Sequence, residues 1–264
     1  MFSADIRILY EFTVETMSLS ETVFLENPAE KGLVIFIHGF MGNPRLFDGF
    51  AKLVNKQGYS AASLLLPGHG GSVKDFASST REQWQAHVDA EIGRFSGDHS
   101  NIWLVGHSMG GLLALNAAVR PDVRVRGVFM IASPFKLAVF PIKANITRIK
   151  YIFYRKTQPK KIAFLANAGI RFSPGVLIRI IKPFAQLRKI MRGTRVILPD
   201  VRVPVTAVYS TSDELSSIKS LDILRSGLSG APFDQLLLSE SLHAFFPAGE
   251  RAEIDRALIE FLVR

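Results

Sequence analysis

NIWLVGHSMGGLLALNAAVR, at residues 101–120, decides how the whole chain is interpreted. It begins with an apolar run and ends with a helical composition, and GHSMG at 106–110 lies between the two. This order predicts a buried strand, a sharp turn and a helix. A side chain exposed at such a turn needs a strained backbone, and flanking glycines remove the Cβ atoms that would collide there. Ser108 is therefore predicted to be a nucleophile. The alternative is a glycine-rich turn with the same sequence pattern and no catalytic function.

A serine hydroxyl needs partners, because it is inert near neutral pH without a base, and the base needs an orienting acid. In a parallel α/β architecture the expected chain order is serine, acid, histidine, each in a loop after a strand. Of the six histidines, only His243 follows Ser108, and it comes after the apolar run at 235–238. His243 is the predicted base.

The predicted acid is Asp213, which lies three residues after the strand-like run at 203–210. Its neighbour Glu214 is the obvious rival. Asp222 and Asp234 are weaker alternatives, because the first falls within a helical pattern and the second precedes a strand. Loop placement alone favours Asp213.

An oxyanion hole is made by backbone N–H groups, which leave no side-chain pattern, so its assignment depends on placement. Met109 follows the predicted nucleophile, and Phe40 lies in the loop after an earlier strand; their N–H groups are the predicted donors. His38 is interpreted as shaping that loop or bonding its backbone. His69 and His107 are interpreted as structural or as lining the pocket.

Around these residues the chain alternates between strand and helix patterns. Strands are predicted within 6–16, 21–27, 33–37, 60–66, 101–105, 125–133, 203–210 and 233–238, with helices at 45–59, 80–95, 111–119, 220–228 and 250–263. This alternation predicts a parallel sheet with helices on both faces. The pattern breaks at 135–199, so we expect one α/β core, formed by 1–134 and 200–264, with an inserted lid at 135–199.

Five short motifs carry a resemblance to a known superfamily. They are HGFMG at 38–42, LLLPGHGGS at 64–72, GHSMGG at 106–111, STSDE at 210–214 and SLHAFF at 241–246. In this order they resemble the α/β-hydrolase superfamily and are similar to its bacterial carboxylesterases and monoacylglycerol lipases. The resemblance implies an eight-stranded, mostly parallel sheet, with Ser108 as nucleophile, Asp213 as acid and His243 as base. Leu242 departs from the glycine that many relatives have before the histidine.

The expected reaction is hydrolysis of a carboxylic ester through an acyl-enzyme. Ser108 excludes the branches that use aspartate or cysteine at this position. An acyltransferase with the same triad, a cofactor-free haloperoxidase-like enzyme and a C–C-bond hydrolase remain alternatives. We expect neither a metal nor an organic cofactor.

Charge is distributed unevenly along the chain, whose net charge is +9. No Asp or Glu lies between Asp122 and Asp200, and 17 of the 32 Lys and Arg residues lie in that interval. The remainder has 15 basic and 23 acidic residues, a net charge of −8. One cationic segment therefore interrupts a mildly anionic chain.

Within that segment, apolar residues recur at helical spacing with basic residues between them. The apolar set is Val176, Leu177, Ile180, Ile181, Phe184 and Leu187, and the basic set is Arg179, Lys182, Arg188 and Lys189. Three interpretations are open: a lid packed on the core with solvated charges, an amphipathic surface on anionic membrane, or a surface that attracts an anionic substrate. Nucleic acid is not expected, because no recognition module is visible.

The remaining composition bounds location and partners. The chain has no cysteine, and Asp5, Glu11 and Glu15 interrupt what would be the apolar core of a signal peptide. Its apolar runs are shorter than the ~20 residues that span a bilayer. We expect a cytoplasmic protein acting on a small acyl-chain-containing ester, with peripheral contact with anionic membrane as an open alternative. The oligomeric state is not indicated.

Overall fold

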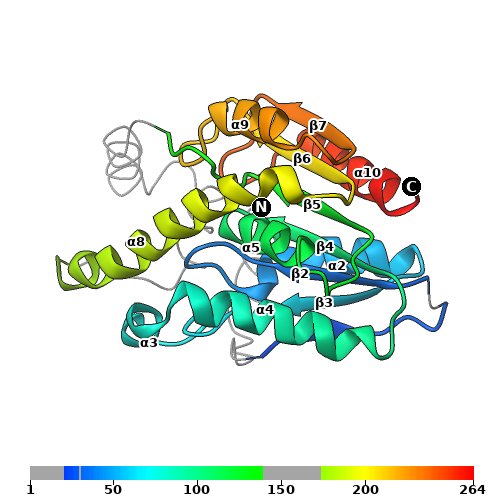
Figure 1. The fold of residues 1–264 in the computed structure, drawn as a ribbon, viewed down its shortest axis with the longest axis horizontal. Coiled ribbons are helices and arrows are strands. Elements are labelled where there is room, and N and C mark those ends of the chain that lie inside the picture. The colour runs from blue at the N-terminus through cyan, green and yellow to red at the C-terminus, as the bar shows by residue number, and fades with distance from the viewer. Residues whose placement is uncertain (1–20, 30, 139–173) are drawn as a thin grey trace, which may run out of the picture.

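The computed structural model describes residues 21–29, 31–138 and 174–264, which form a sheet covered by helices on both faces (Figure 1). The sheet has seven strands in the order β1-β3-β2-β4-β5-β6-β7. All neighbouring pairs are parallel except β1 with β3. The strands are β1 (Val23–Leu25), β2 (Leu33–Ile37), β3 (Ser60–Leu64), β4 (Ile102–His107), β5 (Gly127–Ile131), β6 (Val205–Ser210) and β7 (Phe233–Leu238).

The central strands are apolar throughout because both of their faces are covered. In β2, Leu33, Ile35 and Ile37 point into one buried cluster, while Val34 and Phe36 point into the other. This alternation follows from the two-residue period of a strand. The parallel sheet predicted from the alternating pattern is confirmed.

Two groups of helices cover the sheet. The first face is covered by α4 (Arg81–Ser96), α5 (Met109–Ala118), α8 (Pro174–Ile197) and α9 (Lys219–Gly227). The second face is covered by α2 (Asp48–Lys56) and α10 (Ala248–Leu262). Shorter elements are η1 (Pro44–Phe47), α3 (Val73–Ser78) and η2 (Leu198–Asp200). The helix predicted at 80–95 is confirmed. Thr80 is its N-cap residue and forms a reciprocal pair of hydrogen bonds with Gln83.

The expected strand count differs from the one observed. The resemblance implied eight strands, and the described residues form seven. The strand expected at 6–16 lies outside the described residues, as does the part of the expected lid at 139–173.

The helix α8 has two dissimilar halves. Leu187, Ile190 and Met191 in its second half are buried and belong to the same apolar cluster as α5. Ile178 and Ile181 in its first half are 70% and 66% exposed. The division into a core and a lid at 135–199 stays a prediction. No helix in the described part of the chain is long and apolar enough to cross a bilayer.

Candidate active site

The turn between β4 and α5 holds Ser108 in a backbone conformation that side chains rarely adopt. Its φ and ψ are 54° and −120°. A Cβ at Gly110 would overlap the carbonyl oxygen of Ile37, and a Cβ at Gly106 would overlap the backbone of Gly111. The glycines are therefore required by close backbone approach, as the sequence pattern predicts. The turn presents the Ser108 hydroxyl at the carboxyl end of the central strand.

Three residues predicted to act together lie in one hydrogen-bonded row. His243 Nε2 is 2.9 Å from Ser108 Oγ, and His243 Nδ1 is 3.0 Å from both carboxylate oxygens of Asp213. All three residues are buried. Nδ1–H donates to the carboxylate in this arrangement, which leaves Nε2 to accept the proton of the hydroxyl.

Asp213 is held in its ionised form. Burial alone would raise the pKa of Asp213, but the charge of His243, together with hydrogen bonds from His243, Ser216 and Leu215, lowers it below its ordinary value. The N–H groups of Leu215 and Ser216 each donate to Oδ1 at 2.8 Å. An ionised carboxylate at this position can orient the imidazole and stabilise an imidazolium.

Glu214, the rival acid, contacts a different part of the same histidine. Its Oε2 accepts the backbone N–H of His243 at 3.0 Å. The weaker alternatives lie elsewhere: Asp222 is an exposed residue of α9 near Arg225, and Asp234 on β7 pairs with Arg264. Of the four carboxylates weighed from the sequence, Asp213 is the one that contacts the imidazole ring.

The two predicted oxyanion donors belong to two segments that adjoin Ser108. Met109 is the first residue of α5, where the helix dipole favours negative charge. The loop that contains Phe40 approaches Ser108 closely, since a Cβ on Gly39 would be 2.8 Å from the Ser108 Cβ. Within the described residues, neither the Phe40 nor the Met109 N–H has a backbone acceptor outside the helices and strands.

His38 fixes the shape of the Phe40 loop. Its Nε2 accepts the Leu66 N–H at 3.1 Å, and its Nδ1 lies 2.9 Å from the Gly39 carbonyl oxygen. Burial, followed by the charge of His69, lowers the pKa of His38 well below its ordinary value. A neutral ring with the proton on Nδ1 satisfies both contacts.

His107 connects the serine turn to the histidine loop. Its Nε2 is 2.7 Å from the carbonyl oxygen of His243. Burial, followed by the charge of His243, lowers the pKa of His107 to about 3, so the ring is neutral near pH 7. Sequence reasoning interpreted His107 as structural or pocket-lining; the geometry makes it a hydrogen-bond donor to the histidine loop.

Glu250 was not found from the sequence, although it anchors the loop that carries His243. The carboxylate accepts the N–H groups of Ser239, Glu240 and Ser241 at 2.7–2.8 Å, as well as the hydroxyls of Ser239 and Ser241. Desolvation alone would raise the pKa of Glu250, but hydrogen bonds from the Ser241 hydroxyl and the three N–H groups lower it to about 2. The serine spacing at 239 and 241 was the available signal, but it identifies no acceptor by itself.

This arrangement can activate a hydroxyl for attack on a carbonyl carbon. It holds the Ser108 hydroxyl, the His243 imidazole and the Asp213 carboxylate in one buried, hydrogen-bonded row. In the described part of the chain, no group of three or more His, Asp and Glu side chains has the arrangement to hold a metal ion.

Comparison with known proteins gives a consistent result. A family model described as "Alpha/beta hydrolase family" matches residues 34–249. A thermostable monoacylglycerol lipase of Bacillus sp. (strain H-257) is 26% identical over 239 residues, covering 88% of this chain and 90% of the relative.

Solved structures show the same fold. A structure from work on the metagenome-derived lipolytic enzymes LipS and LipT superposes with a TM-score of 0.69 at 21% identity, covering 92% of this chain and 98% of the other. The monoacylglycerol lipase of Paleococcus ferrophilus gives a TM-score of 0.64 at 20% identity, covering 92% and 97%.

Proposed function

The chain belongs to the alpha/beta hydrolase family, and on this premise we propose that it is a serine hydrolase of carboxylic esters. One observation carries the proposal: the hydrogen-bonded row of Ser108, His243 and Asp213 at a strained strand-to-helix turn. The similarity to a bacterial monoacylglycerol lipase supports an acylglycerol ester as substrate, for which we propose a medium or long acyl chain.

In the proposed reaction, Ser108 Oγ attacks the ester carbonyl carbon while His243 Nε2 accepts the hydroxyl proton. Asp213 holds the imidazole and stabilises the imidazolium. The negative oxygen of the tetrahedral intermediate accepts hydrogen bonds from the Phe40 and Met109 N–H groups. His243 then protonates the departing alcohol. In the second half of the reaction, His243 accepts a proton from water as the water attacks the acyl-enzyme, and it returns the proton to Ser108 when the acid leaves.

A fluorophosphonate probe tests the nucleophile directly. We expect labelling of the wild-type protein, loss of labelling in Ser108→Ala, and full labelling in Ser226→Ala, which alters an exposed serine of α9. A folded wild-type protein whose Ser108 stays unlabelled would refute the proposal.

p-Nitrophenyl esters of increasing acyl length then report the acyl pocket. We expect the highest kcat/KM for esters with medium or long acyl chains, because the expected lid at 135–199 would enclose the acyl chain. A maximum at acetate would contradict the lipid substrate.

Adding an alcohol acceptor and measuring the products separates a hydrolase from an acyltransferase, since an acyltransferase would form the new ester in preference to the free acid.

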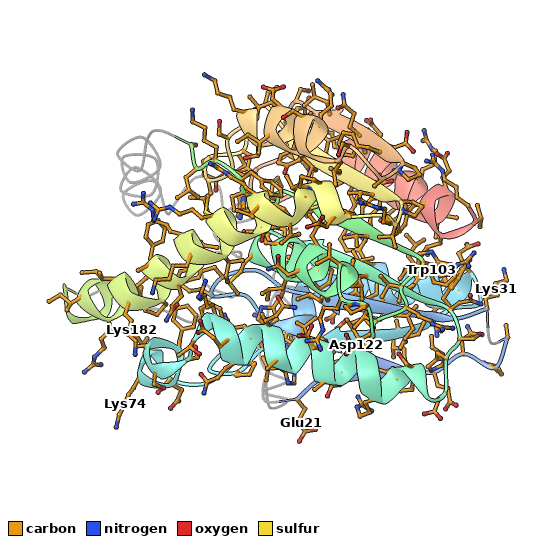
Figure 2. All side chains as sticks on the ribbon, in the orientation of Figure 1. Glu21, Lys31, Lys74, Trp103, Asp122 and Lys182 are labelled. Atoms are coloured by element: carbon orange, nitrogen blue, oxygen red, sulfur yellow. The ribbon has the colours of Figure 1, made fainter. Side chains whose placement is uncertain are left out.

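We also propose peripheral contact between α8 and anionic membrane. Ile178, Ile181 and Phe184 follow one another at three-residue spacing, and all three are exposed. Arg179 and Lys182 lie between them, and Figure 2 shows Lys182 on the first half of α8, pointing away from the sheet. Exposed apolar residues flanked by cations suit the interface of an anionic bilayer.

A further inference from the structure

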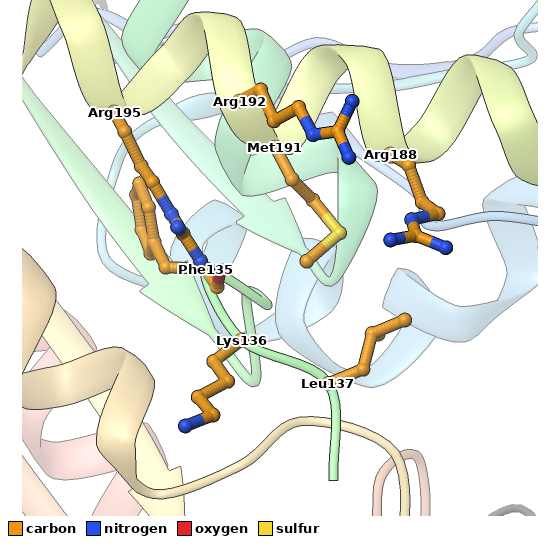
Figure 3. A pocket seen from close by; sticks show the side chains of 7 residues that line it. All are labelled: Phe135, Lys136, Leu137, Arg188, Met191, Arg192 and Arg195. Atoms are coloured by element: carbon orange, nitrogen blue, oxygen red, sulfur yellow. Dashed lines mark hydrogen bonds between the residues drawn. The ribbon is translucent and has the colours of Figure 1, made fainter. Parts of the chain in front are cut away.

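A cavity of about 290 Å³ lies between α8 and the segment that follows β5. Its lining residues are Phe135, Lys136, Leu137, Arg188, Met191, Arg192 and Arg195. Figure 3 shows Arg188, Met191 and Arg195 extending from α8 toward Leu137 and Phe135. The arginines share one side of the helix because they are four and three residues apart.

The cavity is cationic and lacks compensating acids. Four of its seven lining residues are Lys or Arg. Arg195 donates to the carbonyl oxygen of Phe135, which joins α8 to the segment that follows β5. Among the described residues, no carboxylate lies within ion-pair distance of Lys136, Arg188 or Arg192.

One wall of the cavity is continuous with the loop that holds Asp213. Leu137 pairs with Ser216 in an antiparallel bridge, and the Ser217 N–H donates to the Lys136 carbonyl oxygen. Ser216 in turn donates its N–H to Asp213 Oδ1. The cavity is therefore two bonded contacts away from the carboxylate that orients His243.

The helix that lines the cavity also contacts the predicted oxyanion loop. On α8, the ring of Phe184 lies 6.3 Å from the ring of Phe40. Arg188 follows Phe184 by four residues, which is about 6 Å along a helix axis. The row of arginines thus begins one helical turn from Phe184, whose ring contacts that of Phe40.

We propose that this cavity binds an anionic group of the ester substrate, a phosphate or carboxylate remote from the scissile carbonyl. The inference rests on the proposed ester hydrolysis and names its substrate class: acidic esters in preference to neutral ones. Guanidinium groups suit this role because they are permanently charged and donate two parallel hydrogen bonds to an oxyanion. The cavity is at the lower end of the ~300–1,000 Å³ of ligand pockets, so it suits a headgroup and not a whole lipid.

The test compares 1-octanoylglycerol with 1-octanoylglycerol 3-phosphate, which differ only in the anionic group. In the wild-type protein we expect kcat/KM to be higher for the phosphate. In Arg188→Gln/Arg192→Gln, the ratio of the two kcat/KM values should fall about tenfold, mainly through KM of the phosphate ester.

Arg124→Gln/Arg126→Gln is the matched control. It removes two exposed arginines of the same acid-free interval, next to the opposite end of β5. It should leave the ratio as in the wild type. An equal fall in both double variants would overturn the proposal, because the preference would then come from overall charge and not from the cavity.

Calorimetry on Ser108→Ala measures binding at the cavity in a protein that cannot form the proposed acyl-enzyme. Glycerol 3-phosphate should bind this protein and should bind at least tenfold more weakly when Arg188 and Arg192 are also replaced. Failure of ester cleavage with this binding intact would refute only the proposed function. Absence of binding together with an unchanged ratio would refute the cavity.

Inorganic phosphate distinguishes a substrate group from a free effector. We expect inorganic phosphate to inhibit cleavage of the phosphate ester competitively and to leave cleavage of the neutral ester unchanged. A change of the same size in cleavage of the neutral ester would mean that the cavity takes a free anion, which would also overturn the proposal.

Discussion

Asp213 and Glu214 are adjacent carboxylates that hold different parts of one histidine. Asp213 contacts the imidazole Nδ1, and Glu214 accepts the backbone N–H of His243. The first contact controls the tautomer and charge of the ring, whereas the second controls only where the loop lies. Replacing each carboxylate by its amide therefore separates the two roles.

Asp213→Asn should lower kcat by about 10³–10⁴-fold, because an amide that donates to Nδ1 favours the wrong tautomer and cannot stabilise the imidazolium. Glu214→Gln keeps an oxygen that can accept the N–H of His243, so its kcat should fall by about tenfold at most. Steady-state kinetics on a p-nitrophenyl ester measures both. Equal losses in the two variants would contradict the assignment of Asp213 as the acid.

Glu250→Gln should destabilise the protein near pH 7 by about 1–3 kcal/mol, because one amide oxygen cannot satisfy three N–H groups and two hydroxyls. It should also lower kcat, since the histidine loop loses its anchor. Glu253→Gln, an exposed residue of the same helix, should do neither. Urea unfolding monitored by circular dichroism, together with ester kinetics, gives the comparison.

The effect of Glu250 should depend on pH in one direction. The pKa of Glu250 is about 2 in the folded protein, below about 4.3 for an unfolded glutamate, so its contribution is complete above the higher value. It is lost as the pH falls toward the lower one. The gap in unfolding free energy between wild type and Glu250→Gln should narrow from pH 5 to pH 2. A gap that widens on acidification would show that the carboxylate is not held ionised.

The sequence identifies side chains that act through their own chemistry. Ser108, Asp213 and His243 were predicted from residue type, order and strand-end placement, and the structure brings them together. Glu250 was missed because its partners are backbone N–H groups, which every residue has. Glu214 was weighed only as a substitute acid, because spacing does not tell a ring contact from a backbone contact.

Among the elements, the turn from β4 to α5 has the tightest steric requirement. Gly110→Ala should cost at least about 1–3 kcal/mol of unfolding free energy, because the new Cβ meets the backbone of Ile37 and no side chain can move aside. Gly93→Ala on α4 is the matched change, since no atom lies within 4 Å of its Cβ position. It should stabilise the protein by about 0.5–1 kcal/mol. Urea unfolding curves should therefore shift in opposite directions, and a shared direction would contradict the steric account.

The helix α8 shows where a periodic pattern is insufficient. Apolar spacing predicted a helix through 176–187, and the helix exists. Ile181 and Phe184 were grouped with Leu187 on one apolar face, but Leu187 is buried while the other two are exposed. Periodicity states which residues share a side of a helix, and it does not state how far along that side the core extends.

Within the acid-free interval at 123–199, the described part of α8 has two different surfaces. The described part of α8 carries the arginine cavity on its second half and exposed apolar residues on its first half. Composition alone left three interpretations of this charge open. We propose two of them for different halves of α8, so each can be tested without the other.

Membrane contact predicts that the protein co-sediments with phosphatidylglycerol-containing vesicles and not with phosphatidylcholine vesicles. Each basic residue near an anionic surface contributes about 1 kcal/mol, so binding should weaken in about 1 M salt, where the screening length is about 3 Å. Ile178→Asn/Ile181→Asn should reduce binding further, because it removes the apolar part of the contact. Val196→Asn is the matched control: it alters a 76% exposed residue in the second half of the same helix. Equal binding to both kinds of vesicle, binding to neither, or an equal loss in the control would each contradict docking through the first half of α8.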